Sequence, residues 1–211
     1  MAGTFPDAWE EVAKVVIIKL GGTPYGFGAM TETIDISEPD YPGEGIPTVA
    51  GGRVWKQSPQ EDGEITLEIY PTSADTTQTA GGGLFQHFAG GTWDASGALA
   101  TDTTWTAGVD RTRDRFMVVI MWTDDATIDT VAEVLDPTAA TGTNKVALRF
   151  YAKECRITSH KSSYTDGILK TTVTFKFPAM NQAGTTKTHG WESGDDVGTT
   201  ALSALTYATA L

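Results

Sequence analysis

The chain has one cysteine, three histidines and no long apolar run, and these shortages exclude several classes of protein. Cys155 alone cannot form an intrachain disulfide or a thiolate cluster for a metal ion. No stretch approaches the roughly 18 apolar residues of a transmembrane helix, so we expect no membrane contact. The first residues lack the basic-then-apolar order of a signal peptide, and we therefore expect synthesis in the cytoplasm.

Motifs for catalysis are missing as well. The sequence contains no G-x-x-x-x-G-K loop, no G-x-S-x-G elbow, no H-E-x-x-H and no C-x-x-C. His87, His160 and His189 lie far apart, and the acidic residues of 124–129 lack the spacing of a calcium loop. We predict that the protein is not an enzyme and has no catalytic residue, no metal site and no cofactor.

The net charge of −12 is unevenly distributed along the 211 residues. Residues 1–142 carry a net charge of −15, whereas residues 143–211 carry a net charge of +3. An acidic chain of this kind is a poor candidate for a protein that grips nucleic-acid phosphates. An acidic body with a locally basic segment favours self-association. The alternative is that folding mixes these charges over one surface.

Threonine and glycine are abundant, and residues 145–178 are predicted to form one long β-hairpin. Asp166-Gly167 is a two-residue turn of the kind that needs positive φ at both positions. On the polar face, the predicted cross-strand pairs are Thr165 with Ile168, Ser163 with Lys170, Lys161 with Thr172, and Ser159 with Thr174. The opposite face is expected to place Tyr164, His160 and Thr158 across from Leu169, Val173, Phe175 and Phe177. Arms of this length would span roughly 40 Å, and a ribbon so long needs another element or chain to cover its edges.

The remaining segments predict a mainly β fold, a β-sandwich or small barrel with one packed α-helix at about 125–136. Further strands are expected at 14–20, 27–37 and 115–123, and a hairpin from 53–57 and 64–70. Asp125 or Thr127 is the expected cap of the helix, and Pro137 its end. We expect a single domain over 1–211, with a long loop at 38–52 and an extended tail at about 181–211.

Three features of the chain resemble the major tail tube protein of long-tailed viruses, and more broadly the inner-tube fold shared with type VI secretion. These features are the D-G…F-x-F-P stretch of 166–178, the polar-alternating segment Thr31–Ile36 before a long loop, and a single helix between late strands. The resemblance implies a structural subunit whose hexameric rings stack into a hollow conduit for genome delivery. It also implies a place in the virion tail and assembly in the host cytoplasm. Expected partners are copies of itself, together with tape-measure, tail-terminator and baseplate proteins, while viral DNA passes through without specific binding.

A conduit for DNA should offer its phosphates little affinity, and hydroxyl and carboxylate groups offer less than lysines do. The candidate lumen-facing residues are therefore Thr31, Thr33, Asp35, Ser159, Thr172 and Thr174. Lys161, Lys170 and Lys176 share the polar face of the hairpin and are candidate intersubunit charge contacts. Either acids from a neighbouring subunit neutralise them, or this face points outward. The candidate ring-stacking loop is represented by Glu38, Asp40, Tyr41, Glu44 and Ile46.

Two other functions deserve comparison. A carbohydrate-binding β-sandwich module would use Trp93 and Trp105, which lie in expected loops, as stacking platforms. A glycoside hydrolase would need a carboxylate pair such as Glu64 and Glu68. These residues are four apart on one strand face, roughly 13 Å, which is too far for the usual pair.

Overall fold

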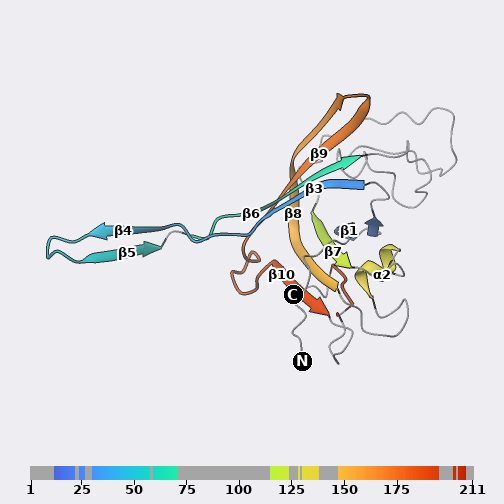
Figure 1. The fold of residues 1–211 in the computed structure, drawn as a ribbon. Helices are drawn as coiled ribbons and strands as arrows, with labels where there is room; N and C mark the ends of the chain where they lie inside the picture. The colour runs from blue at the N-terminus through green and yellow to red at the C-terminus, as the bar shows by residue number, and fades with distance from the viewer. Residues whose placement is uncertain are drawn as a thin grey trace, which may run out of the picture. The chain divides into compact units, whose positions relative to one another are not determined.

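The computed structural model describes residues 12–21, 24–26, 30–57, 59–70, 115–123, 128, 130–137, 147–194, 202 and 204–207. In these described residues the fold is mainly β with one short helix, as the sequence predicts. The chain divides into two compact units (Figure 1). One contains Met1–Gly28, Phe116–Lys153 and His189–Ala210, and the other contains Ala29–Arg115 and Glu154–Thr188. Strand β8 contributes to both units, and the expectation of a single domain stays a prediction.

The first unit is an antiparallel arrangement around a strand that is buried on both faces. Its strands are β1 (Val12–Lys19), β2 (Pro24–Gly26), β7 (Phe116–Thr123), the first part of β8 (Ala147–Thr165) and β10 (His189–Gly194). They follow the order β2-β1-β7-β8-β10. Every residue from Phe116 to Met121 is buried, because a continuous apolar run has no polar side to turn to water. The predicted strands at 14–20 and 115–123 are thus confirmed.

The helix α2 (Val131–Leu135) is shorter than predicted and begins later. Thr130 is its N-cap, and a capping box forms because the Thr130 side chain accepts from the Glu133 N–H while the Glu133 carboxylate accepts from the Thr130 N–H. The sequence pattern T-x-x-E therefore fixes the start of this helix, not Asp125 or Thr127. Val134 and Leu135 are its buried residues.

Part of the predicted C-terminal tail packs on its own chain. Residues His189–Gly194 pair with β8 as β10. Leu202 and Leu205 are buried in the same apolar cluster as Val134, and the Leu205 N–H donates to the Leu135 carbonyl at 2.9 Å. The segment is therefore not wholly extended, because its scattered leucines find apolar surface next to α2.

The second unit contains a four-stranded antiparallel sheet with one apolar face. Its strands are β3 (Met30–Ser37), β6 (Gly63–Tyr70), β9 (Ile168–Phe177) and the second part of β8, in the order β3-β6-β9-β8. Ile65, Leu67 and Ile69 are fully buried, and Ile65 and Leu67 lie opposite the buried Phe175 and Val173. This match explains why the predicted hairpin of 53–57 with 64–70 is wrong: β6 buries its apolar row beside β9 and β3.

The β8–β9 hairpin confirms the predicted register and adds a bulge. All four predicted pairs of the polar face are present, and Asp166 and Gly167 adopt φ of 55° and 80°. The opposite face differs at one position, because Ile157 and not Thr158 lies across from Phe175. Thr158 is the extra residue of a β-bulge, which reverses the alternation of side chains along the strand.

Residues of the predicted loop 38–52 form a strand. β4 (Gly43–Pro47) pairs with β5 (Arg53–Gln57), and the two make a separate two-stranded sheet. A proline is tolerated at position 47 because an edge strand leaves half of its N–H groups unpaired. Gly51, at φ 82°, donates to the Thr48 carbonyl in the connecting turn. Figure 1 shows this hairpin extending away from β3, β6 and β9.

Candidate functional site

One face of the second unit's sheet gathers polar side chains from four strands; we call it the polar face. Residues directly opposite one another in a sheet point to the same side. The register makes two neighbouring rows, Thr33–Glu68–Thr172–Lys161 and Asp35–Thr66–Thr174–Ser159. Five of the six candidate lumen-facing residues lie in these rows. The sixth, Thr31, is opposite Ile69, across a bulge from Thr33.

Two of the three lysines on the polar face pair with acids of the same chain. Lys170 Nζ lies 3.2 Å from Glu68 Oε1, and Lys176 Nζ lies 3.5 Å from Glu64 Oε2. These partly exposed ion pairs contribute at most about 1 kcal/mol each to stability. Their main effect is to cancel charge, so that hydroxyl groups dominate the face. Whether these lysines also contact a second subunit stays a prediction.

A projecting hairpin is the second feature of this unit; we call residues 43–57 the finger. Ile46, Val54 and Trp55 are exposed, and Trp55 retains 72% of its accessible surface. An isolated two-stranded hairpin is marginally stable in water, and clustered exposed apolar side chains mark interaction sites. The candidate stacking residues Glu44 and Ile46 lie within β4.

The other three candidate stacking residues lie at the root of the finger. Glu38, Asp40 and Tyr41 are exposed in the segment between β3 and β4. This root is held by backbone contacts, since the Glu61 N–H donates to the Asp40 carbonyl at 3.0 Å. Gln60 Nε2 donates to the Pro39 carbonyl at 3.1 Å. The finger therefore starts from a fixed base.

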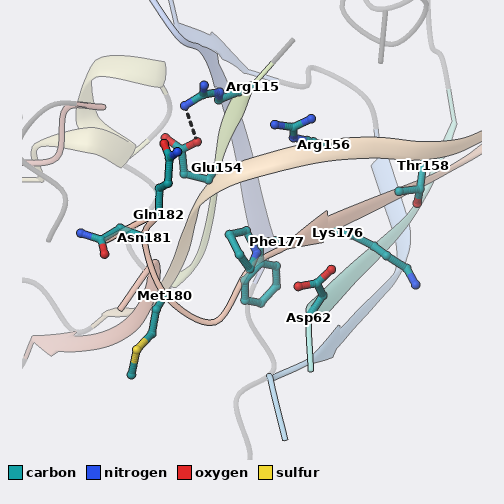
Figure 2. A pocket seen from close by; sticks show the side chains of 11 residues that line it. Asp62, Arg115, Glu154, Arg156, Thr158, Lys176, Phe177, Met180, Asn181 and Gln182 are labelled. Atoms are coloured by element: carbon teal, nitrogen blue, oxygen red, sulfur yellow. Dashed lines mark hydrogen bonds and ion pairs between the residues drawn. The ribbon is translucent and has the colours of Figure 1, made fainter. Parts of the chain in front are cut away.

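A pocket of about 570 Å³ lies in the second unit, near this base (Figure 2). Its lining residues come from several separate segments: Asp62, Arg115, Glu154, Arg156, Thr158, Lys176, Phe177, Pro178, Met180, Asn181 and Gln182. Arg115 Nη1 donates to Glu154 Oε2 at 2.8 Å, and Glu154 adopts a positive φ of 58° within β8. Sequence reasoning missed this pocket, because no local pattern links segments so far apart.

Several predicted features lie outside the described residues, among them Trp93, Trp105, His87 and most of the acidic stretch 124–129. Within the described ranges, no group of three His, Cys, Asp or Glu side chains could hold a metal ion. In the same ranges, no helix is long and apolar enough to cross a membrane. Glu64 and Glu68 each form an ion pair with a lysine, as carboxylates on a charged protein surface do.

Comparisons with known proteins find similarity of fold. No family model matches the chain, and no curated protein matches its sequence. Among solved structures, it is similar to the PVC sheath/tube terminator, in the extended state, of an extracellular contractile injection system. The identity is 12% and the TM-score 0.49, and the match covers 91% of this chain and 100% of the other. It is also similar to the tube-terminating cap of the anti-feeding prophage, at 9% identity and a TM-score of 0.47, covering 92% and 95%. A crystal structure of an Hcp protein matches at 10% identity and a TM-score of 0.33, covering 86% and 98%. Because the identities are this low, the function has to be argued from the residues of this chain.

Proposed function

We propose that this protein is a structural subunit of a viral tail tube, in which hexameric rings stack into a hollow conduit for genome delivery. The observation that carries the proposal is the finger, an isolated two-stranded hairpin with exposed Ile46, Val54 and Trp55. Such a hairpin gains stability only when another surface covers it. A second copy in the next ring supplies that surface.

The polar face is the proposed lining of the conduit. Its rows are rich in threonine and serine hydroxyls, and Glu64 and Glu68 pair with Lys176 and Lys170 on the same face. These two ion pairs reduce the positive charge that the face offers to DNA phosphates, so DNA slides past it without being held. Thr33, Asp35 and Thr174 lie within these rows.

The edge of β3 is the proposed contact within a ring. In the described part of the second unit, β3 ends the order β3-β6-β9-β8 and pairs on one side only. An exposed strand edge is a template for pairing with another chain, and closure into a ring removes the edge. The proposed partners beyond the protein itself are tape-measure, tail-terminator and baseplate proteins, and the proposed location is the virion tail after assembly in the host cytoplasm. The role is not enzymatic.

Electron microscopy of the purified protein at increasing concentration tests this function. We expect rings and stacked tubes from the natural sequence. A variant in which a four-residue Gly-Ser linker replaces the finger, residues 43–57, should lose stacking, because the exposed apolar side chains between rings are gone. A protein that stays monomeric at every concentration and salt level contradicts the proposal.

A further inference from the structure

The pocket near the base of the finger contains charges that have no ion-pair partner among the described residues. Arg115 is paired with Glu154, and Lys176 with Glu64. Arg156 and Asp62 also line the pocket, and neither has an ion-pair partner among the described residues. Arg156 lies directly opposite Lys176 in the register, and like charges at such a position repel each other. The pocket therefore offers one unmatched guanidinium and one unmatched carboxylate.

The same pocket has an apolar wall formed by Phe177, Pro178 and Met180. Phe177 is fully buried, whereas Met180 keeps 37% of its surface exposed. Gly63 allows this arrangement, because a Cβ at position 63 would lie 2.2 Å from the Phe177 ring. Figure 2 shows Asp62 and Met180 on different sides of the Phe177 ring. A matching occupant needs a carboxylate and a cation flanking apolar side chains.

One face of the finger has this composition. Glu44 lies opposite Lys56, and Ile46 lies opposite Val54, so these four side chains share one side of the hairpin. Glu44 and Ile46 are separated by about 7 Å along the strand. Glu44, Lys56, Ile46 and Val54 are all exposed, and neither Glu44 nor Lys56 forms an ion pair with a described residue.

We propose that the pocket is the receptor for the finger of a second copy of this chain. Glu44 pairs with Arg156, and Lys56 pairs with Asp62. Ile46 and Val54 pack against Pro178 and Met180. Because finger and pocket are different patches of one chain, the contact is head-to-tail, and between successive rings it repeats as an open stack. This inference rests on the proposed function and identifies the surface that each ring presents to the next.

Charge reversal with rescue tests this contact. Arg156→Glu and Glu44→Arg should each raise the protein concentration needed for tube formation by about tenfold or more, because each places like charges together. The double variant Arg156→Glu/Glu44→Arg should return this concentration to within about threefold of the natural protein. Assembly is measured by pelleting of tubes and by electron microscopy.

The proposed pair of Lys56 with Asp62 is tested independently in the same way. The variants are Asp62→Lys, Lys56→Glu and the combination of the two. Arg53→Glu is the matched control, because it also reverses a positive charge on the finger. Arg53 lies opposite Pro47, on the same face of the hairpin as Trp55. This control variant should leave assembly unchanged. All substituted side chains are exposed, so the variants should fold, which circular dichroism and thermal unfolding will verify.

Two outcomes overturn the inference and leave the proposed function standing. One is normal assembly of Arg156→Glu while replacement of the finger still abolishes stacking. The other is loss of assembly in both single variants without recovery in the double variant. A natural protein that never assembles overturns the inference and the proposed function together.

Discussion

Arg149 shows how one buried charge organises the first unit. Its side chain is fully buried, and its Nη1 donates to the carbonyls of Val134 and Leu135 at 3.1 and 3.0 Å. Its Nε donates to Glu192 Oε2 at 3.1 Å. The guanidinium thus joins β8, α2 and β10, and it supplies donors to the carbonyl end of a helix that has none of its own basic residues in the last turn.

Replacement of Arg149 by Met should destabilise the protein by about 3 kcal/mol, because it leaves two buried carbonyls and the Glu192 carboxylate without their donor. The free energy of urea-induced unfolding measures this loss. Lys161→Met is the control, since Lys161 is an exposed cation on the same strand, and its effect should stay within about 0.5 kcal/mol. Equal losses in the two variants would contradict this account.

The ionisation of Tyr151 makes the stability of the same region depend on pH. Burial raises the pKa of the Tyr151 phenol above its usual value near 10; the Glu192 carboxylate raises it further, while Arg149 lowers it. Above pH 10 the unfolded chain therefore loses the phenolic proton before the folded chain does. The stabilising contribution is fully present below pH 10 and is lost as the pH rises through the folded pKa.

Tyr151→Phe should consequently flatten the fall in unfolding free energy between about pH 9.5 and 11. Urea unfolding of both proteins at several pH values in this range measures the difference, and the Phe variant should show the smaller slope. Tyr164→Phe, which removes an exposed hydroxyl from the same strand, is the matched control variant. Parallel curves for the natural protein and Tyr151→Phe would rule out this role.

At the scale of elements, strand alternation decides which chemistry each face presents. β6 places Ile65, Leu67 and Ile69 on the buried side and Glu64, Thr66 and Glu68 on the polar face. Thr66 Oγ1 and Thr174 Oγ1 lie 3.3 Å apart, between the two Lys–Glu pairs. The hydroxyls of Thr66 and Thr174 therefore lie between two ion pairs on this face.

The double variant Glu64→Gln/Glu68→Gln should bind double-stranded DNA that the natural protein does not retain. The two lysines lose their carboxylates and become available to phosphates, and the new affinity should fall with added salt. Fluorescence anisotropy of labelled DNA at low salt measures the binding. Glu38→Gln/Glu61→Gln changes the net charge equally, outside the polar face, and should bind no better than the natural protein. Equal binding by the two variants would remove the argument for a lysine-specific effect.

At the scale of the whole molecule, the finger is, among the described strands, the part with the least support from its own chain. Its hairpin pairs only with itself, so it should open more often than the sheet of β3, β6 and β9. Brief trypsin treatment of the unassembled protein should therefore cut after Arg53 and Lys56 before Lys170 and Lys176. In assembled tubes these finger sites should be protected, and mass spectrometry of the fragments identifies the order. Early cleavage in the sheet, or unprotected finger sites in tubes, would contradict the proposed stacking.

The sequence determined the elements whose signals are local. A continuous apolar run predicted a buried strand at 115–123, and Asp166-Gly167 fixed the turn and the register of the pairs around it. The mainly β class followed from the same alternation, and so did the membership of Thr33 and Asp35 in a polar face.

The tertiary structure alone decided which segments meet. Turn and alternation patterns do not say that β6 pairs with β9 and leaves β5 to β4, because that choice depends on apolar rows matching across more than a hundred residues. No turn residue in the sequence marks the bulge at Thr158. This one inserted residue changes which side chains of β8 lie on each face of the sheet. The pocket needs Asp62, Arg156 and Met180 at one place, and only the folded chain brings such distant segments together. The residue types along a short segment set its side-chain alternation and its turns. Which strands pair over long distances in the chain depends on whether their apolar rows match.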